Sequence, residues 1–331
     1  MAQLDELSGA LAEGALAPTV QQRRRRGRLG RVVAIGRRNK LGAFGFILMT
    51  LIILVAVLSP VLQRYGENFA FETENAEFNP TANPLDIARN PNLSSPQILN
   101  RWEPPSGEHW LGTDQFGRDI YARIIVGTRL AVIIGVGASL IAVLSGTITG
   151  LISGYFGGRT DLLTQRLVDA TQAFPGLVLL LLLVSIMDQP NLAVTVAALG
   201  FLGWSASTRI VRSAVLAAAA STYVEAARSY GASHRRVMFR HVLPNILAPV
   251  VVIFSISIGV YVLAEASLSF LGLGPADKTT WGKMVNSGRS ALDLNPWEAV
   301  FSGAAITIAV LAFNLAGDAL RDELDPRLRG R

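Results

Sequence analysis

The chain contains no cysteine and few charged residues. Of its 331 residues, 16% are Asp, Glu, Lys or Arg, whereas a typical soluble domain has about 25%. The absence of cysteine excludes disulfides and thiolate metal sites. The three histidines, His109, His234 and His241, are not spaced as metal ligands. Because half of the residues are hydrophobic, the composition indicates a membrane protein.

Nucleotide-binding and catalytic motifs are also missing. A P-loop reads Gly-x4-Gly-Lys-Ser/Thr. The nearest match, Gly282-Lys283-Met284, has Asp277 in place of the earlier glycine and lacks the final hydroxyl. No Gly-x-Ser-x-Gly elbow and no His-Glu-x-x-His helix occurs. We therefore expect no catalytic residue, metal or cofactor in this chain, and no enzymatic activity from the chain alone.

Long apolar runs dominate the chain instead. A membrane helix needs about 20 mostly apolar residues, and six runs qualify: 41–62, 130–156, 167–187, 192–208, 246–264 and 299–317. Pro175 predicts a kink in the third run. Gly146, Gly150 and Gly154, spaced four apart, predict a seam where another helix backbone approaches closely. The sequence thus predicts an all-α polytopic membrane protein with six transmembrane helices.

Polar stretches divide the chain into five parts. We expect a basic cytoplasmic N-terminal tail (1–40), a first transmembrane helix (41–62), an extracytoplasmic loop with an amphipathic segment (63–129), a core of five transmembrane helices with a polar hairpin at 221–244 (130–317), and a cytoplasmic C-terminal tail (318–331). Of the 30 Lys and Arg residues, 21 fall on the side of the termini and hairpin. Positive residues favour the cytoplasmic side, so both termini and the hairpin are predicted to be cytoplasmic. The net charge of +6 then reflects topology and the lipid surface, with no nucleic-acid partner.

The 221–244 hairpin carries several helix-boundary signals. Thr222 and Glu225 fit a capping box at the start of a first helix. Gly231 stands where a left-handed residue would end that helix. Ser233 can cap a second helix, and Pro244 predicts its end. Together these signals predict a rigid pair of short helices.

The hairpin resembles the EAA loop of ABC importer permeases through Glu225-Ala226-Ala227, Gly231 and Val242-Leu243-Pro244. Four further stretches, HWLGTDQFGRDIYARIIVGTRLAV (109–132), DATQAFP (169–175), AEASLSFLGLG (264–274) and AFNLAGDALRDELDPRLRG (312–330), are similar to the C-type permease subunit of the dipeptide, oligopeptide and nickel branch. The resemblance covers about residues 41–330 and implies the type I ABC importer permease fold. It also implies import of di- or oligopeptides across a bacterial or archaeal cytoplasmic (inner) membrane.

This resemblance further implies that the hairpin is a coupling element seated on an ATPase subunit. The residues expected at that contact are Glu225, Ala226, Ala227, Arg228, Gly231, Arg235, Arg236, Leu243 and Pro244. The implied partners are a homologous second permease subunit, two ATPase subunits or an ATPase homodimer, an extracytoplasmic solute-binding protein and membrane lipid. ATP and Mg²⁺ would be bound by the ATPase subunits.

Two further sites have alternative roles. An ionised carboxylate deep in lipid costs about 2.5–3.5 kcal/mol. Glu265, near the predicted external end of the fifth span, therefore either lines a gate or pathway or lies at the membrane interface. A signature segment contains Gly112, Thr113, Asp114, Gly117, Arg118 and Asp119. Its glycines and charges predict a turn before an amphipathic external helix, and contact with the partner permease or with the solute-binding protein would fit.

Two other classes of function are compatible with the composition. A stand-alone secondary transporter, with Glu265 or Asp169 as its proton site, usually contains inverted repeats, and no convincing repeat is present. An intramembrane enzyme needs paired catalytic residues within its spans, and Glu265 has no evident partner. The substrate stays open among dipeptides, longer peptides, nickel chelates and glutathione.

Overall fold

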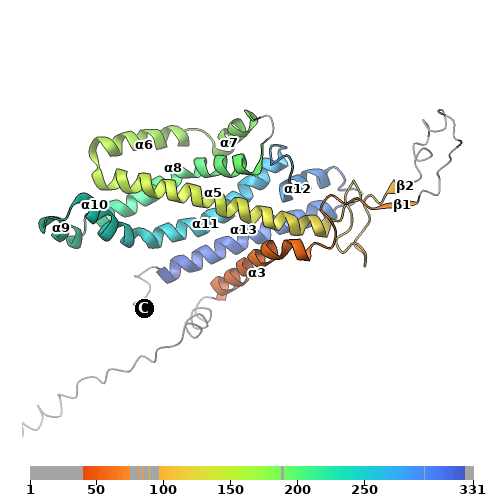
Figure 1. Cartoon of the computed structure of the whole chain (residues 1–331), viewed down its shortest axis with the longest axis horizontal. Coiled ribbons are helices and arrows are strands. Elements are labelled where there is room, and N and C mark those ends of the chain that lie inside the picture. The colour runs from red at the N-terminus through yellow and green to blue at the C-terminus, as the bar shows by residue number, and fades with distance from the viewer. Residues whose placement is uncertain are drawn as a thin grey trace, which may run out of the picture. The chain divides into compact units, whose positions relative to one another are not determined.

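The structure is a computed structural model that describes residues 40–74, 81, 84, 89, 97–187, 190–293 and 295–324. Apart from Lys40, the predicted basic tail at 1–40 lies outside the described residues, and so does the C-terminal tail from residue 325 onward. The described part is almost entirely helical (Figure 1).

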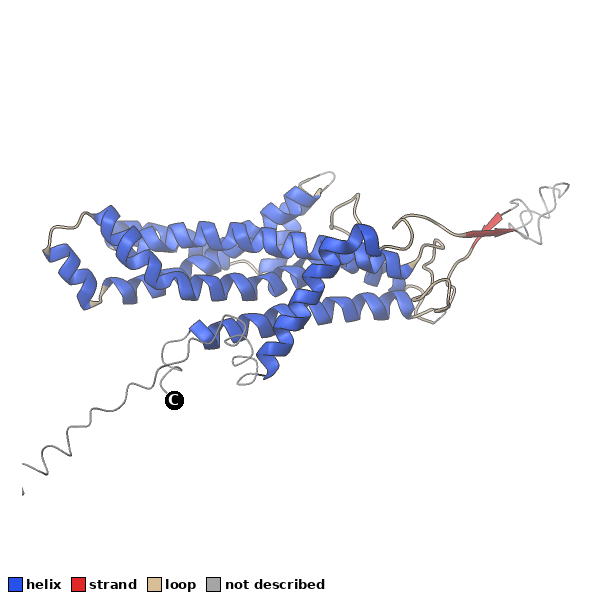
Figure 2. Ribbon diagram, turned by 60° about the horizontal axis from the view of Figure 1, so that its bottom comes forward, coloured by secondary structure: helices blue, strands red, loops and turns tan. Residues whose placement is uncertain are grey.

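Five helical stretches within the described residues are long and apolar enough to cross a membrane. They are α3 (Lys40–Leu62), α5 (Ile120–Phe156), α8 (Leu192–Ala219), the stretch from α10 (His234–Val237) through the π-helical turn η2 (Met238–Val242) into α11 (Leu243–Phe270), and α13 (Trp297–Leu324). α5 packs against α8, and α13 packs against both α11 and α3. The helices form an elongated bundle (Figure 2).

The third predicted span is broken instead of kinked. α6 (Gly158–Gln172) and α7 (Gly176–Ser185) meet at 82°. Pro175 has no amide hydrogen and disfavours helical geometry at Phe174. The first helix therefore ends before Pro175, which becomes the N-cap of α7. A count of six spans is reached only if this bent pair crosses the membrane as one unit.

Three other helices extend beyond their predicted apolar runs. α5 begins at Ile120, so the amphipathic segment before residue 130 is the first part of that helix. α8 continues past residue 208 to Ala219, and α13 continues past residue 317 to Leu324. Polar residues in the first two extensions find acidic partners: Arg123 lies near Asp114, and Arg209 and Arg212 pair with residues of α6. The apolar run thus marks only part of each helix.

The predicted glycine seam on α5 is confirmed, and the helix that approaches it is α8. A Cβ atom on Gly146 would lie 2.9 Å from the backbone nitrogen of Thr208, and one on Gly150 would lie 2.8 Å from the Thr208 carbonyl oxygen. A Cβ atom on Gly154 would lie 3.0 Å from the side chain of Val215. Only glycine allows the two backbones to come this close.

The two ends of the bundle are clearly different. At one end, a short antiparallel ribbon pairs β1 (Glu72–Glu74) with β2 (Gln97–Leu99), both within the predicted loop segment at 63–129. α12 (Trp281–Arg289) lies near this end, while α9 (Thr222–Ser229) and α10 lie at the other (Figure 1). These are termed the ribbon end and the hairpin end.

Three apolar clusters hold the helices together. One joins α5, α7, α8 and α11 and includes Ile134, Leu180 and Leu199. A second, termed the hairpin cluster, contains Leu151, Tyr155, Val211, Val215, Val224, Val237, Met238, Val242 and Ile246. The third joins α5, α11, α12 and α13 through buried residues such as Ile120 and Trp281. The polar hairpin is therefore built onto an apolar core.

Candidate functional site

The first helix of the hairpin starts one residue earlier than the capping-box prediction requires. Ser221 is the N-cap residue of α9, and its hydroxyl donates to the Ala218 carbonyl at 2.5 Å instead of accepting from the helix. Thr222 is already helical, and Glu225 is exposed. The predicted capping box between Thr222 and Glu225 is therefore wrong.

Gly231 ends α9 as predicted. Its φ is +77°, in the left-handed region that glycine adopts without Cβ strain. The Gly231 amide donates to the Arg228 carbonyl at 2.9 Å, and the Ala232 amide donates to the Ala227 carbonyl at 3.1 Å. This pair of bonds is a Schellman motif. It fixes the angle at which the chain turns toward α10.

The second arm starts at Ser233 as predicted, since its side chain accepts from the Arg236 amide. It does not end at Pro244. The Leu243 amide donates to the Met238 carbonyl in a π-type bond, and the Asn245 side chain donates to the His241 carbonyl at 2.6 Å. These two bonds satisfy the Met238 and His241 carbonyls of the η2 turn, although Pro244 has no amide hydrogen to donate. The arm therefore passes without a break into α11.

The inner side of the hairpin is anchored in the hairpin cluster. Val224 of α9 and Val237 of α10 are fully buried, together with Val242 of η2. They pack against Val211 and Val215 of α8 and against the end of α5. Movement of the hairpin must therefore carry the adjoining parts of α8 and α11 with it.

Arg228 makes a contact within its own chain. Its guanidinium lies 5.1 Å from the centre of the Tyr155 ring, at a distance typical of a cation–π interaction. The Tyr155 hydroxyl in turn lies 3.1 Å from Nδ1 of His234. Arg228 is nevertheless exposed, so part of its side chain faces outward. The contact ties α9 to the end of α5.

The outer side of the hairpin is exposed and combines basic and aromatic residues. Of the residues predicted to meet an ATPase, Ala227 and Leu243 are half-buried and the others are exposed: Glu225, Ala226, Arg228, Gly231, Arg235, Arg236 and Pro244. Three aromatic residues on this surface were not predicted from the sequence. Tyr230 is 92% exposed, Phe239 60% and Tyr223 42%. Aromatic side chains in an otherwise polar stretch were the signal that could have found them.

Glu265 lies at the ribbon end of α11 and is 3% exposed. The Ser269 hydroxyl donates to its Oε1 at 2.5 Å. Both residues face other protein groups, and neither faces the outside of this subunit. The carboxylate is thus enclosed between α11 and α12, close to Thr280 and Lys283.

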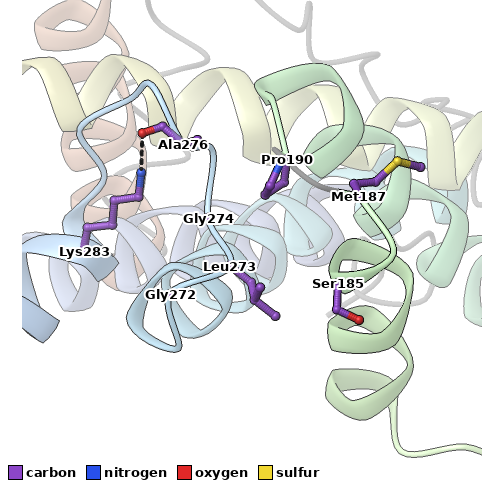
Figure 3. A pocket seen from close by; sticks show the side chains of 8 residues that line it. All are labelled: Ser185, Met187, Pro190, Gly272, Leu273, Gly274, Ala276 and Lys283. Carbon is purple, nitrogen blue, oxygen red and sulfur yellow. Dashed lines mark hydrogen bonds between the residues drawn. The ribbon is translucent and has the colours of Figure 1, made fainter.

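A cavity of about 570 Å³ lies beside Lys283, between the end of α7 and the loop that follows α11 (Figure 3). Its other lining residues are Ser185, Met187, Pro190, Gly272, Leu273, Gly274 and Ala276. The Lys283 ammonium donates to the carbonyls of Pro275, Ala276 and Lys278. Burial lowers the pKa of Lys283, and the nearby Glu265 carboxylate opposes that effect. Lys283 therefore stabilises the conformation of the loop that follows α11.

The signature segment 112–119 ties the loops at the ribbon end to the start of α5. Thr113 is fully buried; its amide donates to the Glu103 carbonyl at 3.0 Å, and its hydroxyl donates to the Asn100 carbonyl at 2.6 Å. Gly112 and Gly117 have positive φ and lie against backbone, so a side chain at either position would clash. The segment is a turn, as predicted, but much of it is buried.

The two aspartates of this segment are buried, and their carboxylates accept hydrogen bonds from nearby protein groups. Asp114 accepts from the amides of Phe116 and Arg118 and from the Arg118 guanidinium at 2.7 Å, and Arg123 lies 3.7 Å away. Asp119 is the N-cap of α5, accepting from the Ala122 amide at 2.8 Å. These bonds give both aspartates a structural role in this subunit.

His109 is the second partner of Asp119. Its Nδ1 lies 3.0 Å from Asp119 Oδ2, and because a carboxylate can only accept, Nδ1 carries the hydrogen. Its Nε2 lies 3.8 Å from Glu103. Among the residues that the structure describes, no group of three or more His, Asp or Glu side chains is arranged to hold a metal ion.

Comparison with known proteins assigns the chain to a family. Residues 146–330 match the family model described as the binding-protein-dependent transport system inner membrane component. The oligopeptide transport system permease protein OppC of Bacillus subtilis (strain 168) is 37% identical over 294 residues, which cover 88% of each chain. The chain belongs to this family.

Two more relatives support the same assignment. The dipeptide transport system permease protein DppC of Alkalihalophilus pseudofirmus is also 37% identical, over 88% of each chain. The glutathione transport system permease protein GsiD of Pectobacterium atrosepticum is 43% identical over 69% of this chain and 75% of its own. A solved structure, that of an amino acid ABC transporter with histidines, aligns with 61% of this chain and 94% of its own at a TM-score of 0.46 and 19% identity, too weakly to add to the assignment.

The part of this inner-membrane permease that matches the family model contains some of the predicted site residues but not all of them. It includes the hairpin at 221–244 and Glu265, while the signature segment at 112–119 precedes it. The hairpin is thus part of what this chain shares with the wider family of transport components.

Proposed function

We propose that this permease is a subunit of an ATP-driven, binding-protein-dependent importer of di- or oligopeptides, coupled to its ATPase through the hairpin. The observation that carries the proposal is the two-sided hairpin. Its inner side is buried in the hairpin cluster, while its outer side presents Tyr230, Phe239, Arg235 and Arg236. Exposed aromatic and arginine side chains are typical of protein interfaces. The names of the curated relatives support peptides as the substrate class.

The rigidity of the hairpin allows it to transmit a movement of the ATPase to the transmembrane helices. Shifting a two-state transporter from 1:99 to 99:1 requires a difference of about 5.5 kcal/mol in binding. Closure of an ATPase can supply this difference only through an element that moves as a unit. The Schellman turn at Gly231 fixes the hairpin internally, and its second arm continues into α11. Leu243 and Pro244 lie within this continuous helix, where they can transmit movement of the hairpin to α11.

The proposed orientation places the hairpin end in the cytoplasm, together with both termini. The excess of Lys and Arg on that side supports this orientation. ATP and Mg²⁺ would bind to the ATPase partners, and the chain itself would have no enzymatic activity. The ribbon end would then face the solute-binding protein outside the membrane.

The exposed face of α6 and α7 is assigned to the second permease subunit. Leu163, Leu167, Phe174 and Val178 are each more than half exposed on this face. α6 also carries Arg159, Asp161, Arg166 and Asp169, so it is poorly suited to contact lipid alone. A protein partner can cover the leucines and leave the charges in contact with protein or water.

Glu265 is assigned an anchoring role between α11 and α12 in preference to a gate. Its burial and its bond to Ser269 support this assignment. Likewise, the buried bonds of Asp114 and Asp119 support a scaffolding role for the signature segment.

Reconstitution tests the proposed function directly. The permease, its homologous partner, both ATPases and the binding protein, taken from neighbouring reading frames, are incorporated into vesicles, and uptake of labelled di- and oligopeptides is measured. We expect uptake that requires ATP, is lost when the ATPase P-loop lysine is replaced, and is insensitive to a protonophore. Uptake that persists without the ATPases and collapses with the proton gradient would instead support a secondary transporter.

A further inference from the structure

α6 is joined to the rest of the subunit by few contacts. It packs against α5 and α8, and Val168 is the only buried residue among its 15 residues. At one end it follows α5 directly after Gly157, and at the other the 82° break separates it from α7. The position of α6 therefore depends on a small number of side-chain interactions.

Two arginine–aspartate pairs supply most of the polar attachment between α6 and α8. Arg212 donates to Asp161 through Nε and Nη2, each at 2.5 Å, in a two-pronged arrangement. Arg209 donates to Asp169 through Nη2 at 2.5 Å. The Ser153 hydroxyl of α5 also donates to Asp161, at 2.5 Å. A two-pronged guanidinium–carboxylate pair fixes direction as well as distance.

The same part of α8 holds the hairpin. Arg209 and Arg212 alternate along the helix with Val211 and Val215, which are buried in the hairpin cluster against Val224. One face of this segment thus contacts the hairpin, and another holds α6. This segment therefore connects the hairpin to α6 through side chains, in addition to the direct chain connection from α5 to α6.

We propose that Arg212 and Arg209, through Asp161 and Asp169, pull α6 along when the hairpin moves, so that these four side chains link the hairpin to the face of α6 and α7 assigned to the second permease subunit. They are positioning residues, because none of them needs to touch ATP or peptide. The inference rests on the proposed function. It adds that α6, with the break before α7, is the element moved in response to the hairpin.

Charge reversal in the reconstituted complex tests this link. Asp161→Arg and Arg212→Asp each place like charges opposite one another, and the double variant restores an opposite pair. We expect each single variant to lower peptide uptake about tenfold, and the double variant to recover at least about a third of wild-type uptake, because coupled residues show non-additive effects. Basal ATP hydrolysis, measured without substrate and binding protein, should stay close to wild type in all three, since the contact with the ATPase is intact. Stimulation by substrate should fall in the single variants, because coupling between two sites is reciprocal.

Lys40→Asp is the matched control. Lys40 is exposed at the start of α3, which packs against α13 and α5, and no ion pair to it is formed by the described residues, so reversing this charge should leave uptake unaltered. If the single reversals insert poorly, Asp161→Asn with Arg212→Gln replaces them; it leaves neither charge of this half-buried pair without its partner, and it should still lower uptake about threefold while basal ATP hydrolysis is unchanged.

The possible outcomes separate the two proposals. Failure of wild-type vesicles to show ATP-driven uptake contradicts the proposed function and the inference with it. ATP-driven wild-type uptake that both single reversals leave unchanged contradicts the inference alone. So does loss of uptake that the double variant fails to restore, or a parallel loss of basal ATP hydrolysis, because either result would mean that the pairs only hold the fold.

Discussion

Gly231→Val is expected to lower peptide uptake by roughly tenfold or more while leaving the permease inserted in the membrane. A β-branched residue at a positive φ costs about 1–3 kcal/mol, and about 1.4 kcal/mol corresponds to a factor of ten. A Cβ atom at this position would meet nothing within 4 Å, so the effect comes from backbone strain and not from a clash. The strain would distort the Schellman turn at Gly231 and so change the angle between α9 and α10. Uptake and ATP hydrolysis measured in the same vesicles check this expectation.

Gly231→Asn is the matched control at the same position. Asparagine tolerates the left-handed region much better than valine does, so this variant should keep most of the uptake although it also adds a side chain. Equal loss in both variants would point to the side chain itself, and full uptake in the valine variant would contradict the coupling role of the turn.

Asp114→Ala is expected to have the largest effect on stability. Asp114 is 1% exposed and neutralises Arg118, with Arg123 close by. Removing one partner of a buried ion pair costs about 3–5 kcal/mol because it leaves the other charge unpaired. The variant should therefore show a much lower yield of folded protein and a lower melting temperature in detergent.

Two companion variants sharpen this expectation. Asp114→Asn keeps an oxygen that can accept from the Phe116 and Arg118 amides, so it should cost less than the alanine variant. Asp277→Ala removes an exposed aspartate whose ion-pair partner among the described residues is Lys278, and it should have almost no effect. A melting temperature of Asp114→Ala equal to wild type would show that the signature segment does not hold the ribbon end together.

Local chemistry made several parts of this structure predictable. The apolar runs located the cores of the spanning helices, because only continuous hydrophobic residues suit the membrane interior. Gly146, Gly150 and Gly154 predicted a close helix contact, and α8 fills that role. Gly231 predicted the end of α9 because few other residues adopt its backbone angles. Each of these signals depends on residues that are near one another in the sequence.

The features that were not predicted depend on contacts between residues far apart in the sequence, or on which of two neighbouring residues the chain uses for the same role. Ser221 and Thr222 can both cap a helix, and the chain uses the first of them. Pro244 is accommodated by η2 and by the Asn245 side chain, which no single-residue preference reveals. The pairing of Arg212 with Asp161 requires α6 to fold back along α8. The position of the hairpin in the chain was therefore predictable, whereas the attachment of α6 to α8 was not.

The central claim is that the outer side of the hairpin contacts an ATPase subunit, and site-specific cross-linking tests it most directly. Because the chain has no cysteine, one introduced cysteine provides a unique attachment point. A photoactivatable maleimide is attached at Tyr230→Cys and, as a control at the ribbon end, at Asp277→Cys, in the assembled complex. We predict a cross-linked product with the ATPase from position 230 and none from position 277. An ATPase product from position 277, with none from position 230, would contradict the account.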